Sequence, residues 1–201
     1  MSLKENHIYP VFDQILRRED KEKLLNQRSK VIWCTGLSGA GKTTLAKNLE
    51  KALHVQGYLT QVLDGDNIRS GINNNLKFTE TDRKENIRRI AEVSKLLINS
   101  GVITINSFIS PTQEIRQVAI DIIGEENFIE IFVRAPIEVC EKRDVKGLYA
   151  KARAGKIKNF TGVDSPFESP QKPHLVIDTD KYSIQECLNQ AMDCVLPYLK
   201  Y

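Results

Sequence analysis

The segment GLSGAGKTT, residues 36–44, constrains this chain more than any other stretch of its sequence. It fits the spacing G-x-x-x-x-G-K-[ST], in which glycines let the backbone curl so that several N–H groups point inward at an anion. An apolar run, VIWCTG (31–36), precedes it, and a helical pattern, TTLAKNLEKALHVQG (43–57), follows it. A buried strand, a loop and a helix are the context that this motif requires. The segment therefore predicts a phosphate-binding loop at a helix N-terminus, where the helix dipole also favours anions.

The residue types of this loop indicate how it would hold a nucleotide. Lys42 can reach the terminal phosphates, and the Thr43 hydroxyl is suited to bind Mg²⁺. Such a loop does not by itself distinguish a kinase from a GTPase or a motor ATPase. The guanine-reading motif N-K-x-D is absent, and the apolar run 102–108 ends in INSF without an aspartate that would serve as a metal ligand. Another part of the chain must therefore supply the carboxylates of a metal site.

Short apolar runs alternate with longer amphipathic segments along the rest of the chain, which indicates an α/β fold with a parallel sheet. We expect strands at residues 31–36, 60–64, 102–108, 128–133 and 174–178, and helices at 11–28, 43–57, 79–101, 112–123, 136–144 and 183–199. Residues 145–173 contain glycines, lysines and prolines with little periodicity, which is typical of a functional loop or lid. The sequence predicts one domain, 1–201, with a three-layer P-loop NTPase fold, a five-stranded parallel sheet flanked by helices, and an N-terminal helical extension at 1–29.

Composition argues against several other classes of protein. The net charge of +3 is too small to indicate a nucleic-acid partner or a membrane surface. No apolar stretch is long enough to span a bilayer, and the opening MSLKENHIYP lacks a signal-peptide pattern. The cysteines are widely spaced without a metal-ligand pattern, so we expect them to be reduced in a cytoplasmic protein. They are Cys34, Cys140, Cys187 and Cys194.

The stretch QVLDGDNIRSG (61–71) places two aspartates directly after an expected strand. Ligands of open α/β sheets bind at the carboxyl ends of the strands, so Asp64 and Asp66 should face the same crevice as the phosphate loop. A carboxylate there can orient Mg²⁺ or its waters, or accept a proton from an attacking hydroxyl. The alternative is an Asp-Gly turn that caps a short helix over residues 67–72.

Basic residues downstream are suited to bind a second anion. Arg69, Arg83, Arg88 and Arg89 offer forked contacts to phosphate or sulfate oxygens, and Asn86 shares a helix face with Arg83. The alternative for Arg88 and Arg89 is an ion-paired helix surface, which we prefer for at least one of them.

Two further features follow expected strands or lie in polar loops. Ser110, in SFISP (107–111), would cap the next helix, contact a substrate or take up a phosphoryl group. Phe78 and Phe160 lie in the polar stretches NLKFTE and IKNFTG. Isolated aromatic residues usually belong to the core, but in such loops they can also enclose a planar base.

Five stretches, in order and spacing, resemble the adenosine 5′-phosphosulfate kinases (APS kinases, adenylylsulfate kinases). They are WCTGLSGAGKTTLA, LDGDNIRSG, DRKENIRRIAEV, SFISP and RDVKGLYAKARAGKIKNFTGVDSPFE, and the likeness covers roughly residues 30–180. That family uses ATP to phosphorylate the 3′-hydroxyl of APS, giving PAPS and ADP, the activation step of sulfate assimilation. The resemblance implies this activity, with Mg²⁺ as cofactor, a homodimer, and an association with ATP sulfurylase.

The resemblance also implies roles for individual residues. Asp66 would be the general base, acting with Lys42, and the metal site would consist of Thr43, Asp64 and Asp66. Ser110 occupies the position described as a phosphoserine intermediate, although direct in-line transfer needs no phosphoenzyme. The implied ATP-binding residues are Gly36, Leu37, Ser38, Gly39, Ala40, Gly41, Lys42, Thr43, Thr44 and, near the base, Arg143. The implied APS-binding residues are Asp66, Arg69, Phe78, Arg83, Asn86, Ile109, Ser110, Lys146, Gly147, Leu148 and Phe160.

The lid would span residues 145–169. Thr112 and Ala150 depart from the family pattern, and both departures bear on substrate affinity more than on reaction type. Two alternatives stay open: a kinase for another small hydroxylated metabolite, such as a nucleoside or a sugar acid, and a nucleotide-binding regulatory module without catalysis. An arginine cluster and paired phenylalanines argue against a plain sugar, and the intact Lys42, Thr43 and Asp66 argue against a lost activity.

Overall fold

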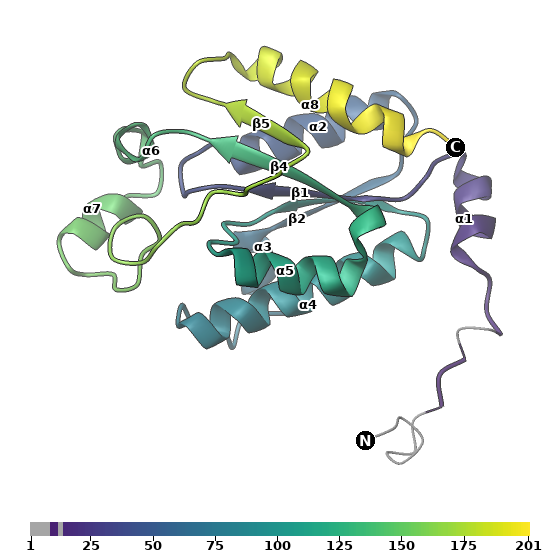
Figure 1. The fold of residues 1–201 in the computed structure, drawn as a ribbon, viewed down its shortest axis with the longest axis horizontal. Helices are drawn as coiled ribbons and strands as arrows, with labels where there is room; N and C mark the ends of the chain where they lie inside the picture. The colour runs from purple at the N-terminus through teal and green to yellow at the C-terminus, as the bar shows by residue number, and fades with distance from the viewer. Residues whose placement is uncertain (1–8, 12–13) are drawn as a thin grey trace.

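The computed structural model describes residues 9–11 and 14–201 and is built on one parallel five-stranded sheet (Figure 1). The strands lie in the order β2-β3-β1-β4-β5, and every neighbouring pair is parallel. Their bounds are β1 Val31–Thr35, β2 Thr60–Asp64, β3 Ile103–Ser107, β4 Phe128–Arg134 and β5 Leu175–Asp178. The predicted five-stranded parallel sheet is therefore confirmed. Because its strands are parallel, their carboxyl ends meet at one edge, which is where the predicted site lies.

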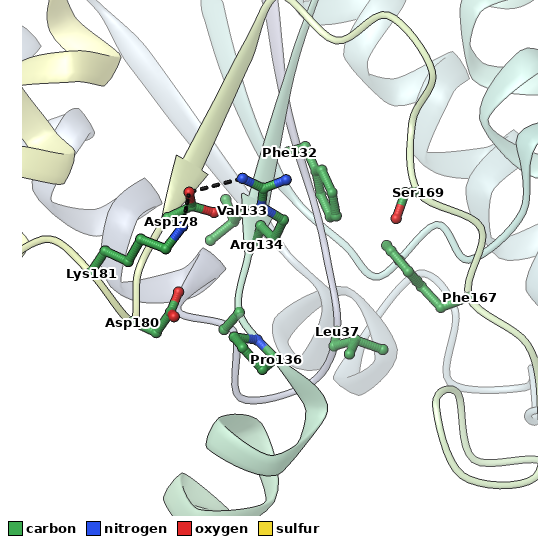
Figure 2. Close-up of a pocket in the computed structure, with 11 residues that line it drawn as sticks. Leu37, Phe132, Val133, Arg134, Pro136, Phe167, Ser169, Asp178, Asp180 and Lys181 are labelled. Atoms are coloured by element: carbon green, nitrogen blue, oxygen red, sulfur yellow. Dashed lines mark hydrogen bonds and ion pairs between the residues drawn. The ribbon is translucent and has the colours of Figure 1, made fainter.

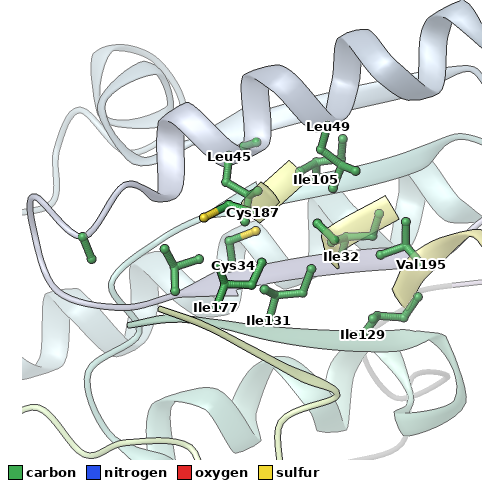
Figure 3. Packing of buried hydrophobic residues seen from close by; sticks show 14 of the residues in the cluster. Ile32, Cys34, Leu45, Leu49, Ile105, Ile129, Ile131, Ile177, Cys187 and Val195 are labelled. Carbon is green, nitrogen blue, oxygen red and sulfur yellow. The ribbon is translucent and has the colours of Figure 1, made fainter. Parts of the chain in front are cut away.

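Helices cover both faces of the sheet, which gives the predicted three layers (Figure 1). Side chains of β1 alternate between two apolar cores: Ile32 and Cys34 belong to one, Val31 and Trp33 to the other. The first core is closed by α2 (Lys42–Val55) and α8 (Ile184–Leu199), and the second by α4 (Glu80–Ile98) and α5 (Gln113–Ile123). Figure 3 shows the first core, in which Leu45 and Leu49 of α2 lie over the strands. Burial on both faces explains why the strands read as continuous apolar runs.

The N-terminal helix is shorter than the predicted 11–28. It spans α1, Arg18–Leu25, and residues 12–13 of the prediction lie outside the described residues. The Arg17 N–H donates to Asp20 Oδ2 (3.1 Å) at its start, and Asn26 adopts a left-handed conformation (φ 52°) at its end. Local hydrogen bonds at both ends therefore limit a helical pattern that continues in the sequence.

The predicted lid is also not a simple loop. After α6 (Ile137–Arg143) the chain forms a further short helix, α7 (Leu148–Arg153), where periodicity indicated none. The Asp144 carboxylate accepts hydrogen bonds from the N–H groups of Tyr149 (3.0 Å) and Ala150 (3.1 Å), and Tyr149 is buried. One capping aspartate and one buried ring thus stabilise a helix that is too short to show a period.

Two short elements complete the fold: α3 (Gly65–Ser70) and the 3₁₀ turn η1 (Glu125–Asn127). Within residues 9–11 and 14–201, no helix combines the length and the apolar character needed to cross a membrane.

Candidate active site

The loop between β1 and α2 has the conformation that its glycines allow. Gly39 has φ +76°, and a Cβ atom there would lie 2.9 Å from the backbone oxygen of Cys140. A Cβ atom on Gly36 would lie 2.2 Å from the backbone oxygen of Val133 in β4. A side chain at either position would collide with backbone, so the close turn of the loop against β4 and α6 requires glycine.

Lys42 lies inside this loop and is buried. Its Nζ donates to the carbonyl oxygens of Gly36 (2.9 Å) and Leu37 (2.8 Å). Burial lowers the pKa of Lys42 to about 8, with a smaller lowering by the ammonium of Lys146. The charge of the Lys42 ammonium is therefore poorly compensated within the loop, and a bound polyphosphate would compensate it.

Oxygen donors meet beside the start of α2. The Thr43 hydroxyl donates to Asp64 Oδ2 (2.7 Å) and lies 3.4 Å from the Ser107 hydroxyl at the end of β3. Asp64 also accepts from the Asp66 N–H (3.1 Å) and so caps α3. Asp64 thus has both of the roles considered from the sequence: it caps the short helix α3, and its carboxylate lies beside the phosphate loop.

These donors fit Mg²⁺, because a hydroxyl and a carboxylate are hard oxygen ligands. Within the described parts of the chain, His, Cys, Asp and Glu form no cluster of three or more that could hold an ion without other ligands. Mg²⁺ in such a site is held by one or two protein oxygens together with substrate phosphates. The metal site expected from the sequence did not include Ser107.

Asp66 forms an ion pair with Lys146, which arrives from the lid 80 residues later in the chain. Both side chains are largely exposed. The Asp66 N–H donates to Asp64, which in turn accepts the Thr43 hydroxyl, so the Asp66–Lys146 pair lies beside the phosphate loop. The structure therefore brings three of the predicted residues together from α3, the lid and the loop.

Arg69 and Phe78 lie against each other near Asp66. The Arg69 guanidinium is 4.5 Å from the centre of the Phe78 ring, and the Arg83 guanidinium is 6.0 Å from it. Burial lowers the pKa of Arg69, whereas the nearby Asp82 and Asp66 carboxylates raise it. Phe78 itself is 56% exposed, so part of its side chain is accessible to a ligand.

Arg83 also connects this region to the lid, since its Nη1 donates to Thr161 Oγ1 (2.8 Å). Asn86, one turn further along α4, is buried and accepts from Asn73 Nδ2 (3.0 Å). The arginines that follow are used locally: Arg88 and Arg89 both bind Glu85 (2.7 and 2.8 Å). Arg88 and Arg89 therefore form the ion-paired helix surface that was the alternative to an anion-binding role.

Phe160 differs from Phe78 because it is buried. Its ring packs edge-on against Tyr149, with the ring centres 4.9 Å apart at an interplanar angle of 75°. Leu148 packs beside them, and Gly147 (φ +63°) precedes α7. In this arrangement Phe160 belongs to the core beneath the lid, and its contact with an adenine stays a prediction.

Ser110 is buried and has a positive φ of +44°. The Trp33 indole N–H donates to its Oγ (2.9 Å). The expectation that Ser110 caps the following helix is wrong: Thr112 is the N-cap of α5 and its hydroxyl accepts from the Ile115 N–H (3.3 Å). The neighbouring Ile109 carbonyl accepts from a hydroxyl of β1 (2.6 Å).

Sequence reasoning missed a buried pair that supports this loop. Arg116 Nη1 donates to the Ser110 carbonyl (2.9 Å), and its Nε lies 3.3 Å from Glu130 Oε1. Burial raises the pKa of Glu130, and the Arg116 charge lowers it. The available signal was that Arg116 falls at helical spacing with the apolar residues Ala119, Ile120 and Ile123.

A cavity of about 300 Å³ borders the phosphate loop at Leu37 (Figure 2). It lies at the carboxyl ends of β4 and β5, between Phe132 and Phe167 on one side and the Arg134–Asp178 ion pair on the other. Of the predicted site residues only Leu37 lines it. The cavity therefore adjoins the predicted nucleotide site without containing its charged residues.

A parallel three-layer fold with a lysine-bearing phosphate loop, a hydroxyl–carboxylate pair and a lid defines the class of P-loop kinases. Residues 28–178 match the family model described as adenylylsulphate kinase. The chain belongs to this family. It is an enzyme that binds ATP and transfers a phosphoryl group.

Individual relatives agree with this assignment. The adenylyl-sulfate kinase of Bacteroides thetaiotaomicron is 61% identical, covering 98% of this chain and 98% of that protein. That of Clostridium acetobutylicum is 51% identical, covering 92% and 90%. Among solved structures, the APS kinase CysC of Mycobacterium tuberculosis in complex with AMPPNP and APS superposes with a TM-score of 0.81 at 43% identity, covering 84% of this chain and 98% of that chain.

Proposed function

We propose that this chain uses ATP to phosphorylate the 3′-hydroxyl of adenosine 5′-phosphosulfate, producing PAPS and ADP. Family membership supports the reaction class. One observation carries the mechanism: the Asp66–Lys146 ion pair joins α3 to the lid beside Asp64, which accepts the Thr43 hydroxyl of the phosphate loop. The Arg69–Phe78 contact lies near the Asp66 carboxylate. A donor polyphosphate would bind at the loop, an anionic nucleotide acceptor would bind at Arg69 and Phe78, and the Asp66 carboxylate would act between them.

In this proposal the loop amides and Lys42 bind the terminal phosphates of ATP. Thr43 and Asp64, with Ser107 beside them, would hold Mg²⁺, which would neutralise charge on the phosphates. Asp66 accepts the proton of the acceptor hydroxyl as phosphoryl transfer proceeds. Arg69 binds the acceptor's anionic group, and Phe78 stacks on its adenine.

Lys146 has a role before and after the acceptor binds. Its ammonium pairs with Asp66, so this pair must separate or share a ligand before Asp66 can act as a base. A phosphate group in the crevice offers Lys146 a stronger anion. Closing the lid over the site would then exclude water and favour transfer over hydrolysis.

The environment of Ser110 supports direct transfer. Its hydroxyl is buried and accepts the Trp33 N–H, so forming a phosphoserine would require this serine to leave its hydrogen bond and reach the donor. We therefore propose that Ser110 shapes the acceptor side and carries no phosphoryl group in turnover.

We also propose a homodimer in the cytoplasm that associates with ATP sulfurylase. The family resemblance supports this proposal, and the four free cysteines agree with a reducing compartment. Sedimentation of the purified chain, alone and with an ATP sulfurylase, tests both associations.

The assay of the function measures ADP and PAPS from ATP, Mg²⁺ and APS, with a nucleoside and a sugar acid as parallel acceptors. We expect turnover at micromolar APS and none with the other acceptors. Turnover with another acceptor alone would favour the other metabolite kinase. Tight ATP binding with no turnover on any acceptor would favour the regulatory module.

A further inference from the structure

Three side chains from outside the phosphate loop each donate a hydrogen bond to one of three successive carbonyl groups of the loop. The donors come from the lid helix α7, from the end of α6 and from the turn after β5. The bonds join the Tyr149 hydroxyl to Ser38 O (2.9 Å), Arg143 Nη1 to Gly39 O (3.2 Å) and Thr179 Oγ1 to Ala40 O (2.7 Å).

These three bonds determine where the loop's N–H groups point. A carbonyl and the N–H that follows it belong to one rigid, trans peptide plane and point in opposite directions. Holding the carbonyls of Ser38, Gly39 and Ala40 away from the centre therefore orients the N–H groups of Gly39, Ala40 and Gly41. The Ala40 N–H donates to the Leu37 carbonyl (3.1 Å), and those of Gly39 and Gly41 are directed towards the centre. Those N–H groups are the ones that a P-loop offers to phosphate oxygens.

Two of the donors also bind each other, so Arg143 and Thr179 act as one unit. Arg143 donates from Nη1 to Thr179 Oγ1 (3.0 Å) and from Nη2 to Thr179 O (2.7 Å). The Thr179 N–H donates to the Arg134 carbonyl of β4 (3.0 Å), which anchors the unit to the sheet. Tyr149 is buried, and Phe160 packs on its ring.

We propose that Tyr149, Arg143 and Thr179 are positioning residues that keep the phosphate loop preorganised for ATP, and that Tyr149 couples this state to the lid. None of the three needs to touch the nucleotide to do so. The inference concerns the nucleotide site of the proposed function, but it can be tested on ADP binding without any acceptor. In this role Arg143 acts through the loop backbone, in addition to any contact with the ATP base.

The test uses two substitutions that each remove one hydroxyl, Tyr149→Phe and Thr179→Val, in the full chain with Mg²⁺ and ADP. Losing one neutral hydrogen bond that orders the site should raise the Kd of ADP about fivefold in each variant. The KM for ATP should rise by a similar factor. The KM for APS should stay within about twofold in Thr179→Val, since the hydrogen bonds of Thr179 join it to Ala40, Arg134 and Arg143, which lie outside the lid.

Matched controls exist for both changes. Tyr198→Phe removes an exposed hydroxyl of α8. Thr104→Val removes a buried hydroxyl of β3 that has no hydrogen-bond partner among the described residues. Neither control should change the Kd of ADP, although each makes the same type of substitution as one of the test variants.

Amide hydrogen exchange separates positioning from a general structural role. We expect faster exchange at residues 39–41 of the ligand-free test variants, with unchanged exchange in β1 and β4. An ADP Kd within twofold of the unmodified protein in both variants would overturn the proposal. So would an equal rise in ADP Kd and APS KM in Thr179→Val, because that pattern indicates general loosening. If the protein made no PAPS at all, the ADP affinities would still decide this question.

Discussion

The buried ammonium of Lys42 leads to a prediction about pH. Burial lowers the pKa of this side chain to about 8, against an ordinary value of 10.5. A polyphosphate bound in the loop favours the charged form and raises the pKa again. Nucleotide binding must therefore take up a proton wherever part of the free protein carries the neutral amine.

The size and sign of this effect follow from the shifted pKa. With a value near 8, the amine is neutral in about a tenth of the free molecules at pH 7, about half at pH 8 and about nine tenths at pH 9. Because binding consumes a proton, affinity falls as pH rises through this window. We expect the Kd of ADP to increase about tenfold between pH 7 and pH 9.

Isothermal titration calorimetry with ADP and Mg²⁺, in pairs of buffers with different ionisation enthalpies, measures the proton uptake directly. It should grow across the window in the unmodified protein and disappear in Lys42→Met. Lys47→Met, an exposed lysine on the same helix, should keep the full pH profile. Uptake that is independent of pH, or that persists without Lys42, would refute the reasoning.

Three further expectations concern the acceptor side and its support. Asp66→Asn should lower kcat by ~10²-fold or more while the Kd of ADP stays within about twofold; a near-normal kcat would remove its role as base. Ser110→Ala should keep substantial turnover and change the fluorescence of Trp33, whose N–H loses its acceptor; complete inactivity would support a phosphoserine intermediate. Arg116→Met should lower the free energy of unfolding by about 3–5 kcal/mol near neutral pH, because Glu130 is left buried and unpaired. Burial raises the pKa of Glu130, so the lost free energy of unfolding should become smaller as pH falls and Glu130 becomes protonated. The double variant Arg116→Met/Glu130→Gln should recover most of the lost free energy. A loss that chemical denaturation finds to be independent of pH would contradict this account.

Local patterns in the sequence determined the architecture and the phosphate loop. Continuous apolar runs mark strands buried on both faces, and each of the five lies where predicted to within a residue or two. The loop conformation requires glycines at fixed positions in residues 36–44, whatever the rest of the protein is. The phosphate-binding role of Lys42 and the metal-binding role of Thr43 could therefore be predicted from spacing alone. Asp64 and Asp66 could be placed beside them because parallel strands end at one edge.

Only the tertiary structure decided which partner each of these side chains has. The pairing of Asp66 with Lys146 crosses 80 residues, and no local pattern encodes it. The burial of Phe160 depends on packing against Tyr149. The N-cap of α5 is Thr112 and not Ser110, whose backbone has a positive φ. Tyr149 donates to a loop 111 residues earlier, because the sheet order places β4 and the segments that follow it directly beside β1. Periodicity and spacing describe neighbours along the chain, whereas the hydrogen bonds that orient the phosphate loop join segments brought together by the order of the strands.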